Sequence, residues 1–303
     1  MNIFITGGTG FVGSALSKSL LEKGHSVKIL TRNITKDKNH SDRLSFIEGD
    51  STQKGQWIDQ LTDCDVVINL AGASIFKRWT PEYKQTLIKS RIRTTENIVG
   101  GLSGRKKGKL LLISTSAVGY YGFHGDEELD ESAFPGSDFL ASLSMEWEAA
   151  ANEAQKAGAR VIINRFGVVL GKDGGAVPMM IPLFKYWLGS PLGKGGQYFS
   201  WIHITDLVNI ILFQVENKDL NGPFNCTAPN PVTNMEFTGA IATAMNKPLF
   251  MPPVPGFALR LIMGEFADVL LKGQRVIPRR LTDAGYSFEF PEIKSALEDI
   301  LRR

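Results

Sequence analysis

The feature that most limits how this chain can fold is a glycine-rich segment close to its start. It reads TGGTGFVG over residues 6–13 and lies between a β-rich run at 2–6 and a helical pattern at 11–23. A strand, a glycine turn and a helix in this order begin a βαβ unit, whose helix packs back onto a parallel sheet. The segment therefore predicts an α/β chain.

Each glycine of this segment has a separate physical task. Gly7 permits the tight turn, Gly10 lets the backbone come close to a diphosphate, and Gly13 allows the helix to pack closely on the strand. The N–H groups at the start of the helix carry partial positive charge, which suits a diphosphate. We expect a dinucleotide to be bound by Gly7, Gly10, Phe11, Val12 and Gly13. A glycine turn without a ligand is the alternative.

The first half of the chain alternates β-rich runs with helical patterns, which is typical of a parallel sheet. Strands are predicted at 2–6, 27–31, 44–48, 66–70, 110–114 and 160–165, and helices at 11–23, 81–102 and 139–157. Glycine and proline become frequent after Gly171. We expect a doubly wound parallel Rossmann sheet over 1–171 with a return strand near 222–227, and a smaller α+β substrate domain over 172–303.

Composition and charge exclude several other classes. The 303 residues carry 34 Lys and Arg against 31 Asp and Glu, a surplus too thin and too scattered for a nucleic-acid partner. Two distant cysteines, Cys64 and Cys226, predict neither a disulfide framework nor a metal site. With no secretion signal and no apolar run near 20 residues, we expect a cytoplasmic protein without a membrane partner. A homodimer is left open.

The second predicted strand ends at Thr31 and is followed by Arg32, at the place where a site specific for NAD carries an Asp or Glu against the ribose 2′-hydroxyl. A guanidinium at this place suits a 2′-phosphate, which a carboxylate would repel. We therefore predict that the cofactor is NADP. The alternative is that Arg32 is only a solvated residue at a strand end.

Further candidates for cofactor binding follow the next two strands. Asp50 is expected either to accept a hydrogen bond from the adenine amino group or to form a turn. Leu70, Ala71 and Gly72 end the fourth strand, where small residues let a dinucleotide lie against the backbone. Arg91, in the helix that follows, is a candidate phosphate ligand.

The order and spacing of several motifs resemble a known group. NLAGA at 69–73, STSAVGYYG at 114–122 and WIHITDL at 201–207, with the glycine segment, resemble the extended, atypical short-chain dehydrogenase/reductase superfamily, in its NAD(P)-dependent epimerase/dehydratase group. The C-terminal part, from FNCTAPNPVTNMEF at 224–237 onward, is similar to the subfamily called epimerase family proteins. The resemblance implies an NADP-dependent oxidoreductase or epimerase with its own C-terminal domain.

The catalytic pattern of that superfamily is only half present. Its members use a Ser or Thr after the fifth strand, which Ser116 matches, and a Tyr-x-x-x-Lys pair whose Tyr exchanges a proton with the substrate. When Glu148 is aligned with the acid of the same helix, Leu140 stands at the Tyr position and Ser144 at the Lys position. The chain has no Tyr-x-x-x-Lys anywhere, so the usual mechanism does not carry over.

Other residues are candidates to replace the missing pair. They are Tyr120 and Tyr121, and Lys185 or Lys194 from the second domain. We predict Ser116 and Tyr121 as the catalytic residues, with aromatic packing as the alternative role of the tyrosines. His203 is expected to be a structural histidine before a helix capped by Thr205 or Asp206.

The substrate is less constrained. The position of the arginine that clamps the diphosphate in nucleotide-sugar epimerases is occupied by Phe199. The predicted pocket walls suit an apolar or planar substrate, unless these side chains are plain core; they are Phe184, Trp187, Tyr198, Phe199 and Trp201.

Three functions are compatible with these residues. The first is an NADP(H)-dependent oxidoreductase or epimerase-like enzyme that acts on a small carbonyl or hydroxyl compound with a nonstandard proton donor. The second is a non-catalytic NADP(H)-binding redox sensor or scaffold. A nucleotide-sugar epimerase is least favoured, because Leu140 and Phe199 both speak against it.

Overall fold

A seven-stranded parallel sheet forms the centre of the computed structural model, which describes residues 1–34, 42–102 and 110–302. The strand order is β11-β7-β5-β4-β1-β2-β3, and every neighbouring pair is parallel. The strands are β1 (Asn2–Thr6), β2 (Ser26–Thr31), β3 (Leu44–Glu48), β4 (Val66–Asn69), β5 (Leu111–Ala117), β7 (Arg160–Phe166) and β11 (Gly222–Cys226). This is the doubly wound Rossmann arrangement expected from the sequence.

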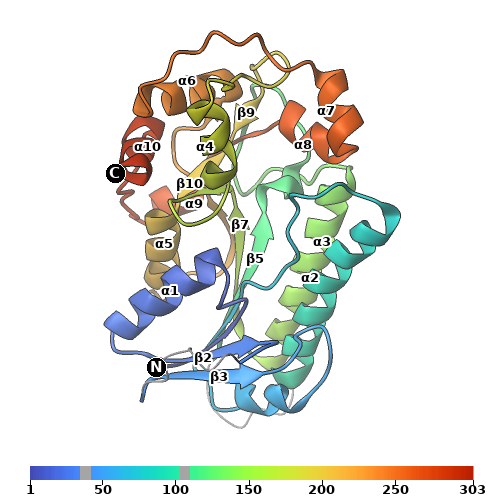
Figure 1. Cartoon of the computed structure of the whole chain (residues 1–303). Coiled ribbons are helices and arrows are strands. Elements are labelled where there is room, and N and C mark those ends of the chain that lie inside the picture. Colours follow the sequence, from blue (N-terminus) through green and yellow to red (C-terminus); the bar gives the residue numbers. More distant parts are fainter. Residues whose placement is uncertain (35–41, 103–109, 303) are drawn as a thin grey trace.

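Helices cover both faces of the sheet (Figure 1). One face carries α1 (Phe11–Glu22) and α5 (Ile204–Glu216), and the other carries α2 (Pro81–Leu102), α3 (Phe139–Asn152), η1 (Gln56–Leu61) and η3 (Glu153–Ala157). Side chains alternate between the faces, since Ile3 and Ile5 pack with α1 and α5 while Phe4 packs on the other side. The apolar residues of β1 are therefore buried on both faces of the sheet, as in other central parallel strands.

The predicted elements differ from the observed ones mainly at their ends. β5 continues to Ala117, which is three residues beyond the predicted end. The helix predicted at 139–157 divides into α3 and η3, and Gly158 in the left-handed conformation follows. α2 has the predicted bounds, and α1 ends one residue early, before the turn at Gly24.

The rest of the chain forms further helices and short strand pairs, most of them beyond the carboxyl ends of the central strands. The helices are α4 (Val177–Lys185), α6 (Asn234–Ala244), α7 (Gly256–Met263), α8 (Phe266–Leu271), α9 (Arg279–Asp283) and α10 (Ile293–Leu301), with η2 (Val118–Tyr121) after β5. The strand pairs are β8 (Val168–Leu170) with β10 (Trp201–His203), β9 (Tyr198–Phe199) with β12 (Val232–Thr233), and β6 (Glu128–Leu129) with β13 (Arg275–Val276).

The segment after residue 171 contributes to both parts of the molecule. α5 packs in the same hydrophobic cluster as α1, and β11 pairs with β7 at the edge of the sheet. A domain boundary at 171 stays a prediction. Within the described ranges, no helix has the length and the apolar character needed to cross a membrane.

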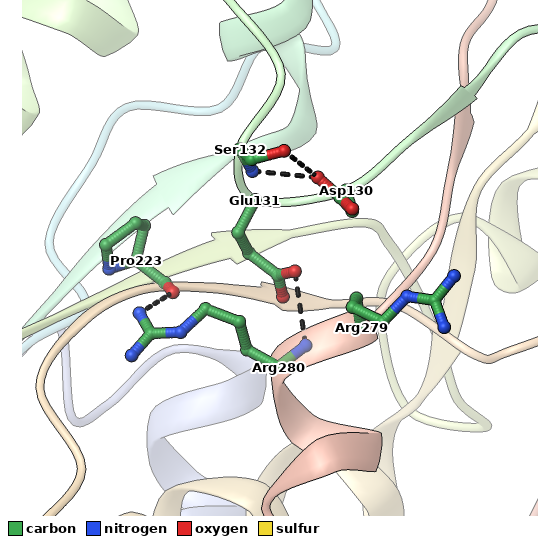
Figure 2. A pocket seen from close by; sticks show the side chains of 6 residues that line it. All are labelled: Asp130, Glu131, Ser132, Pro223, Arg279 and Arg280. Atoms are coloured by element: carbon green, nitrogen blue, oxygen red, sulfur yellow. Dashed lines mark hydrogen bonds between the residues drawn. The ribbon is translucent and has the colours of Figure 1, made fainter.

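Side chains from two distant segments cover the exposed edge of β11 (Figure 2). The Arg280 guanidinium donates to the carbonyls of Pro223 at 2.7 Å and Asn221 at 2.8 Å. The Glu131 carboxylate accepts from the Asn225 N–H at 2.8 Å and from the Arg280 N–H at 3.2 Å. Peptide groups that another strand would otherwise pair with are thus occupied.

Candidate cofactor-binding and catalytic site

The glycine turn after β1 is closed by contacts that leave no room for side chains at two of its positions. Gly7 has a φ of +71°, and a Cβ there would lie 2.7 Å from the Leu70 carbonyl carbon. A Cβ on Gly13 would lie 2.3 Å from the Gly7 carbonyl oxygen. Gly10 differs, because its Cβ would meet only that oxygen, at 3.3 Å. The space above Gly10 is therefore open. The packing of the chain itself does not require a glycine at this position.

The start of α1 offers donors to an anion beside this opening. Gly10 occupies the N-cap position and has no side chain to bond the first N–H groups, and the first turn carries no acidic residue. The Phe11 ring turns away from the opening and packs against the segment before α4, where Cβ atoms on Gly171 and Gly174 would lie 2.5 and 2.4 Å from it. Phe11 and Val12 would thus meet a diphosphate through their backbone.

The residues after β2 and β3 lie at the same edge of the sheet. Arg32 is exposed and forms no ion pair with any residue in the described part of the chain, and Thr31 donates through Oγ1 to the Asn33 carbonyl. The Asp50 Oδ1 accepts from the Thr52 N–H at 2.9 Å and from its hydroxyl at 2.8 Å, which is a turn-forming role. Contact between Asp50 and an adenine stays a prediction.

Arg91 reaches the loop after β4 from α2. Its guanidinium donates to the carbonyls of Ala73 at 3.1 Å and Leu87 at 3.3 Å, and a Cβ on Gly72 would lie 3.2 Å from its Cζ. Burial lowers the pKa of Arg91 to about 10. No carboxylate among the described residues pairs with this charge, so it is free to be compensated by an anion.

A hydrogen-bond network that the sequence did not reveal joins the glycine turn to this loop. The Thr6 hydroxyl donates to Asn69 Oδ1 at 2.7 Å, and Asn69 Nδ2 donates to Thr95 Oγ1 at 2.9 Å. Trp147 Nε1 donates to the same Thr95 oxygen at 3.0 Å, and the Arg91 guanidinium lies over the Trp147 ring. The ends of β1 and β4 are therefore held in register beneath the expected dinucleotide.

Ser116 and Tyr121 lie in a second buried network at the ends of β5 and β7. The Ser116 hydroxyl donates to Glu148 Oε1 at 2.7 Å, and Arg165 pairs with both oxygens of the same carboxylate at 2.8 Å. Arg165 also donates to the Tyr121 hydroxyl at 2.9 Å, which in turn donates to Asn225 Oδ1 at 2.7 Å. The sequence analysis did not identify Arg165 and Asn225, although a charged residue directly after the apolar run at 161–163 was a signal.

These contacts do not favour proton transfer by either predicted catalytic residue. Ser116 and Tyr121 are 1% and 0% exposed, and both hydroxyls already have acceptors inside the protein. Burial, opposed by the Arg165 charge, raises the pKa of Tyr121 to about 12. A proton donor of this superfamily needs the opposite shift. The catalytic role of both residues stays a prediction.

The positions of the missing Tyr and Lys are occupied by side chains that fit neither role. Leu140 lies against Gly119 and packs on the hydrophobic cluster of Trp79, Leu143 and Phe266, whereas Ser144 is buried in α3.

In the part of the chain that the structure describes, the buried hydroxyls of Ser114 and Thr115 have no hydrogen-bond partner. The Thr115 hydroxyl was not singled out from the sequence.

His203 has a structural role, and three of the five predicted pocket walls belong to one hydrophobic cluster. The predicted cap of α5 by Thr205 or Asp206 is wrong, because the buried His203 is itself the N-cap, with Nδ1 accepting from the Thr205 N–H at 3.2 Å. Phe184 and Trp201 are buried in a hydrophobic cluster, and Phe199 stacks on Phe237 with ring centroids 4.2 Å apart. Phe184 and Trp201 are therefore core residues, whereas Phe199 is partly buried against the same cluster.

Comparison with known proteins agrees with the fold and the cofactor loop. The family model described as "NAD dependent epimerase/dehydratase family" matches residues 3–227, and a domain of unknown function, DUF1731, matches residues 254–300. The chain belongs to the NAD dependent epimerase/dehydratase family. The glycine turn after β1 is consistent with the nicotinamide dinucleotide dependence for which that family is described.

The relatives narrow the family to one branch. The chain is 40% identical to "Epimerase family protein SDR39U1 homolog, chloroplastic" of Arabidopsis thaliana, over 100% of this chain and 87% of the relative. It is also 40% identical to "Epimerase family protein SA0724" of Staphylococcus aureus, over 98% of each. The resemblance to epimerase family proteins is thus confirmed.

Solved structures resemble the whole chain. The human epimerase family protein SDR39U1 with NADPH has a TM-score of 0.86 and 32% identity, and 99% of each chain is covered. A nucleoside-diphosphate sugar epimerase from Corynebacterium glutamicum has a TM-score of 0.79 and 31% identity, over 99% of this chain and 58% of that one. UDP-glucuronic acid 4-epimerase from Bacillus cereus has a TM-score of 0.81 at 18% identity and shares the fold.

Proposed function

We propose that this protein is an NADP(H)-dependent oxidoreductase or epimerase-like enzyme that acts on a small carbonyl or hydroxyl compound without a Tyr-x-x-x-Lys pair. The observation that carries the proposal is Arg32, exposed and free of ion pairs within the described ranges, at the strand end where an NAD-specific site has an acid. The human relative whose structure contains NADPH supports the same cofactor.

The residues of the site fit this cofactor. The open space at Gly10 and the donors of α1 would receive the diphosphate, and Arg32 would bind the 2′-phosphate in a forked geometry. Arg91 holds the loop after β4 and leaves one buried positive charge for a phosphate. When bound, the cofactor supplies or accepts a hydride. The chain's own part at this end of the site is to bind the cofactor and to orient it.

A titration of both dinucleotides tests the proposal. We expect wild type to bind NADPH at least ten times more tightly than NADH, because a charge-assisted hydrogen bond contributes about 1.5–3 kcal/mol. Arg32→Asp should lose most of this preference. Arg43→Asp is the control, because Arg43 is also exposed but lies directly before β3, at the opposite edge of the sheet. This variant should keep the preference for NADPH. Equal affinities for the two dinucleotides in wild type would remove the argument.

A non-catalytic NADP(H)-binding sensor is the second candidate. It is supported by the buried network in which the Ser116 and Tyr121 hydroxyls are both occupied. This candidate predicts tight NADPH binding, no turnover across a panel of carbonyl compounds, and a change in oligomeric state between NADPH and NADP. Light scattering with each cofactor form also tests whether the protein is a homodimer.

Our proposal includes a small-molecule partner and a cytoplasmic location. The proposed location rests on the sequence, in which Cys64 and Cys226 form no disulfide-framework pattern, as is usual in a reducing compartment. Within the described residues, no group of three or more His, Cys, Asp or Glu is placed to hold a metal ion.

A further inference from the structure

A positively charged side chain without a counter-ion lies beside the loop after β4. Arg91 donates to the carbonyls of Ala73 at 3.1 Å and Leu87 at 3.3 Å, and its guanidinium carbon lies 5.2 Å from the centre of the Trp147 ring. None of the carboxylates in the described ranges forms an ion pair with it. Burial lowers the pKa of Arg91 only to about 10, so the side chain keeps its charge at neutral pH.

The guanidinium is held in place from two helices and a loop. The Arg91 carbonyl on α2 accepts from the Thr95 hydroxyl at 2.8 Å, and the same Thr95 oxygen accepts from Trp147 Nε1 on α3. The Ser90 hydroxyl oxygen accepts from the Ala73 N–H at 3.0 Å, which fastens the loop that Arg91 bonds. α2 and α3 lie side by side (Figure 1). The charge therefore has a fixed position without any ligand.

This position belongs to the half of the site that is away from Arg32. In the sheet, β1 lies between β2, which Arg32 follows, and β4, which is followed by the loop that Arg91 bonds. The diphosphate of the proposed cofactor belongs at the glycine turn after β1, and the half with the 2′-phosphate extends toward Arg32. The nicotinamide half then extends in the opposite direction, toward the ends of β4 and β5 and toward Arg91.

Arg91 also lies near the positions of the missing Tyr and Lys. Trp147, the ring beneath the guanidinium, follows Ser144 by three residues on α3, so the two side chains are on the same face of that helix. Ala73, whose carbonyl Arg91 bonds, packs on the same hydrophobic cluster as Leu140. A positive charge is thus present near these two positions, although it comes from α2.

The charge at the nicotinamide end depends on the redox state of the cofactor. The nicotinamide ring is positive in NADP⁺ and neutral in NADPH, whereas the phosphates are the same in both. A fixed cation without a counter-ion near the ring repels the oxidised form and not the reduced form.

We propose that Arg91 discriminates between the two redox states and makes this protein bind NADPH more tightly than NADP⁺. This inference rests on the proposed function and assigns a role at the β4 end of that same site. A contact between Arg91 and a phosphate is compatible with it, because such a contact strengthens the binding of both forms alike.

The Kd of NADP⁺ divided by the Kd of NADPH, here called the redox ratio, tests the proposal. Calorimetric titration of each variant with both forms gives this ratio, in which any loss of affinity common to the two forms cancels. We expect a wild-type ratio of about ten, because charges within one site interact through an effective dielectric constant of about 20. A ratio of ten corresponds to a rise of about 30 mV in the potential of the bound two-electron couple. A wild-type ratio near one would overturn the proposal.

Three variants locate the effect. Arg91→Gln keeps a polar donor and removes the charge, so it should lower the redox ratio to near one, whereas Arg91→Lys keeps the charge and should keep the ratio. Arg93→Gln is the matched control, because Arg93 is on the same helix but is exposed and paired with Glu96, and it should not change the ratio. If Arg91→Gln lowers both affinities equally or leaves both unchanged, Arg91 does not discriminate and the proposal is overturned.

The proposed function and this inference can fail separately. If wild type binds NADPH and NADH equally but Arg91→Gln still lowers the redox ratio, the preference for NADP is wrong and the role of Arg91 stands. If Arg32→Asp removes the preference for NADPH over NADH while Arg91→Gln leaves the redox ratio unchanged, the proposed cofactor stands and this inference is overturned. Arg32→Asp should itself leave the redox ratio unchanged, because β1 and β4 separate Arg32 from the nicotinamide end.

Discussion

The two ends of the site differ in how their polar groups are paired. At the β1–β2 end, the first turn of α1 is uncapped by a side chain, and Arg32 has no ionic partner among the described residues. At the β5–β7 end, the Arg165 guanidinium, the Glu148 carboxylate and the Tyr121 hydroxyl bond to one another inside the protein. Groups kept unpaired at a surface are available to a ligand, whereas groups that satisfy each other stabilise the fold. The β1–β2 end thus has groups that could bind a dinucleotide, whereas the β5–β7 end lacks the usual acid–base pair.

The largest effect is expected from a variant that tests whether the Arg165–Glu148 network at the β5–β7 end stabilises the fold. Glu148→Ala should lower the free energy of unfolding by about 3–5 kcal/mol, because it leaves the buried Arg165 without its counter-charge. Urea denaturation measures this change. Glu153→Ala is the control, since it removes an exposed pair with Lys156 and should cost less than about 1 kcal/mol. Equal losses in the two variants would contradict the comparison.

A pair of glycine variants tests the β1–β2 end of the site. Gly13→Ala should destabilise the free protein by about 1–3 kcal/mol and abolish tight NADPH binding, because its Cβ would lie 2.3 Å from a backbone oxygen. Gly10→Ala should cost the free protein less than about 1 kcal/mol, because its nearest neighbour is 3.3 Å away. We expect Gly10→Ala to weaken NADPH binding about tenfold all the same. Thermal unfolding and NADPH titration of both variants measure the difference, and unchanged binding by Gly10→Ala would place the diphosphate elsewhere.

The smallest expected effect concerns the alkaline limb of stability. The pKa of Tyr121 is raised to about 12 in the folded protein from an ordinary value near 10, so the unfolded chain loses this proton first. The contribution of Tyr121 to stability is therefore complete below pH 10 and declines as the pH rises toward 12. Between pH 9 and 11, wild type should lose more stability in urea than Tyr121→Phe does. Tyr186→Phe, at an exposed position, should behave like wild type, and parallel losses in all three would show that Tyr121 is not held neutral.

The sequence predicted the regions whose signals are local. The glycine turn, the strand ends and the helix 81–102 each depend on a short pattern, and the structure has them within a few residues. The Ser116 network depends on partners that only the fold brings together, since Tyr121 and Asn225 are 104 residues apart. Leu140 at the Tyr position was visible in the sequence, but the cluster it packs on includes Phe266 from the C-terminal part, which has no local signal.

The covered edge of β11 has a consequence for how this protein can be divided. The family model ends at residue 227, yet Arg280, which blocks the edge carbonyls, comes from the segment matched by the other model. A chain cut between the two would present an unpaired outer strand, which is a template for association with other strands. The C-terminal segment therefore keeps the outer strand of the sheet from being open to association, and we expect a chain cut between the two segments to aggregate more readily than the whole chain.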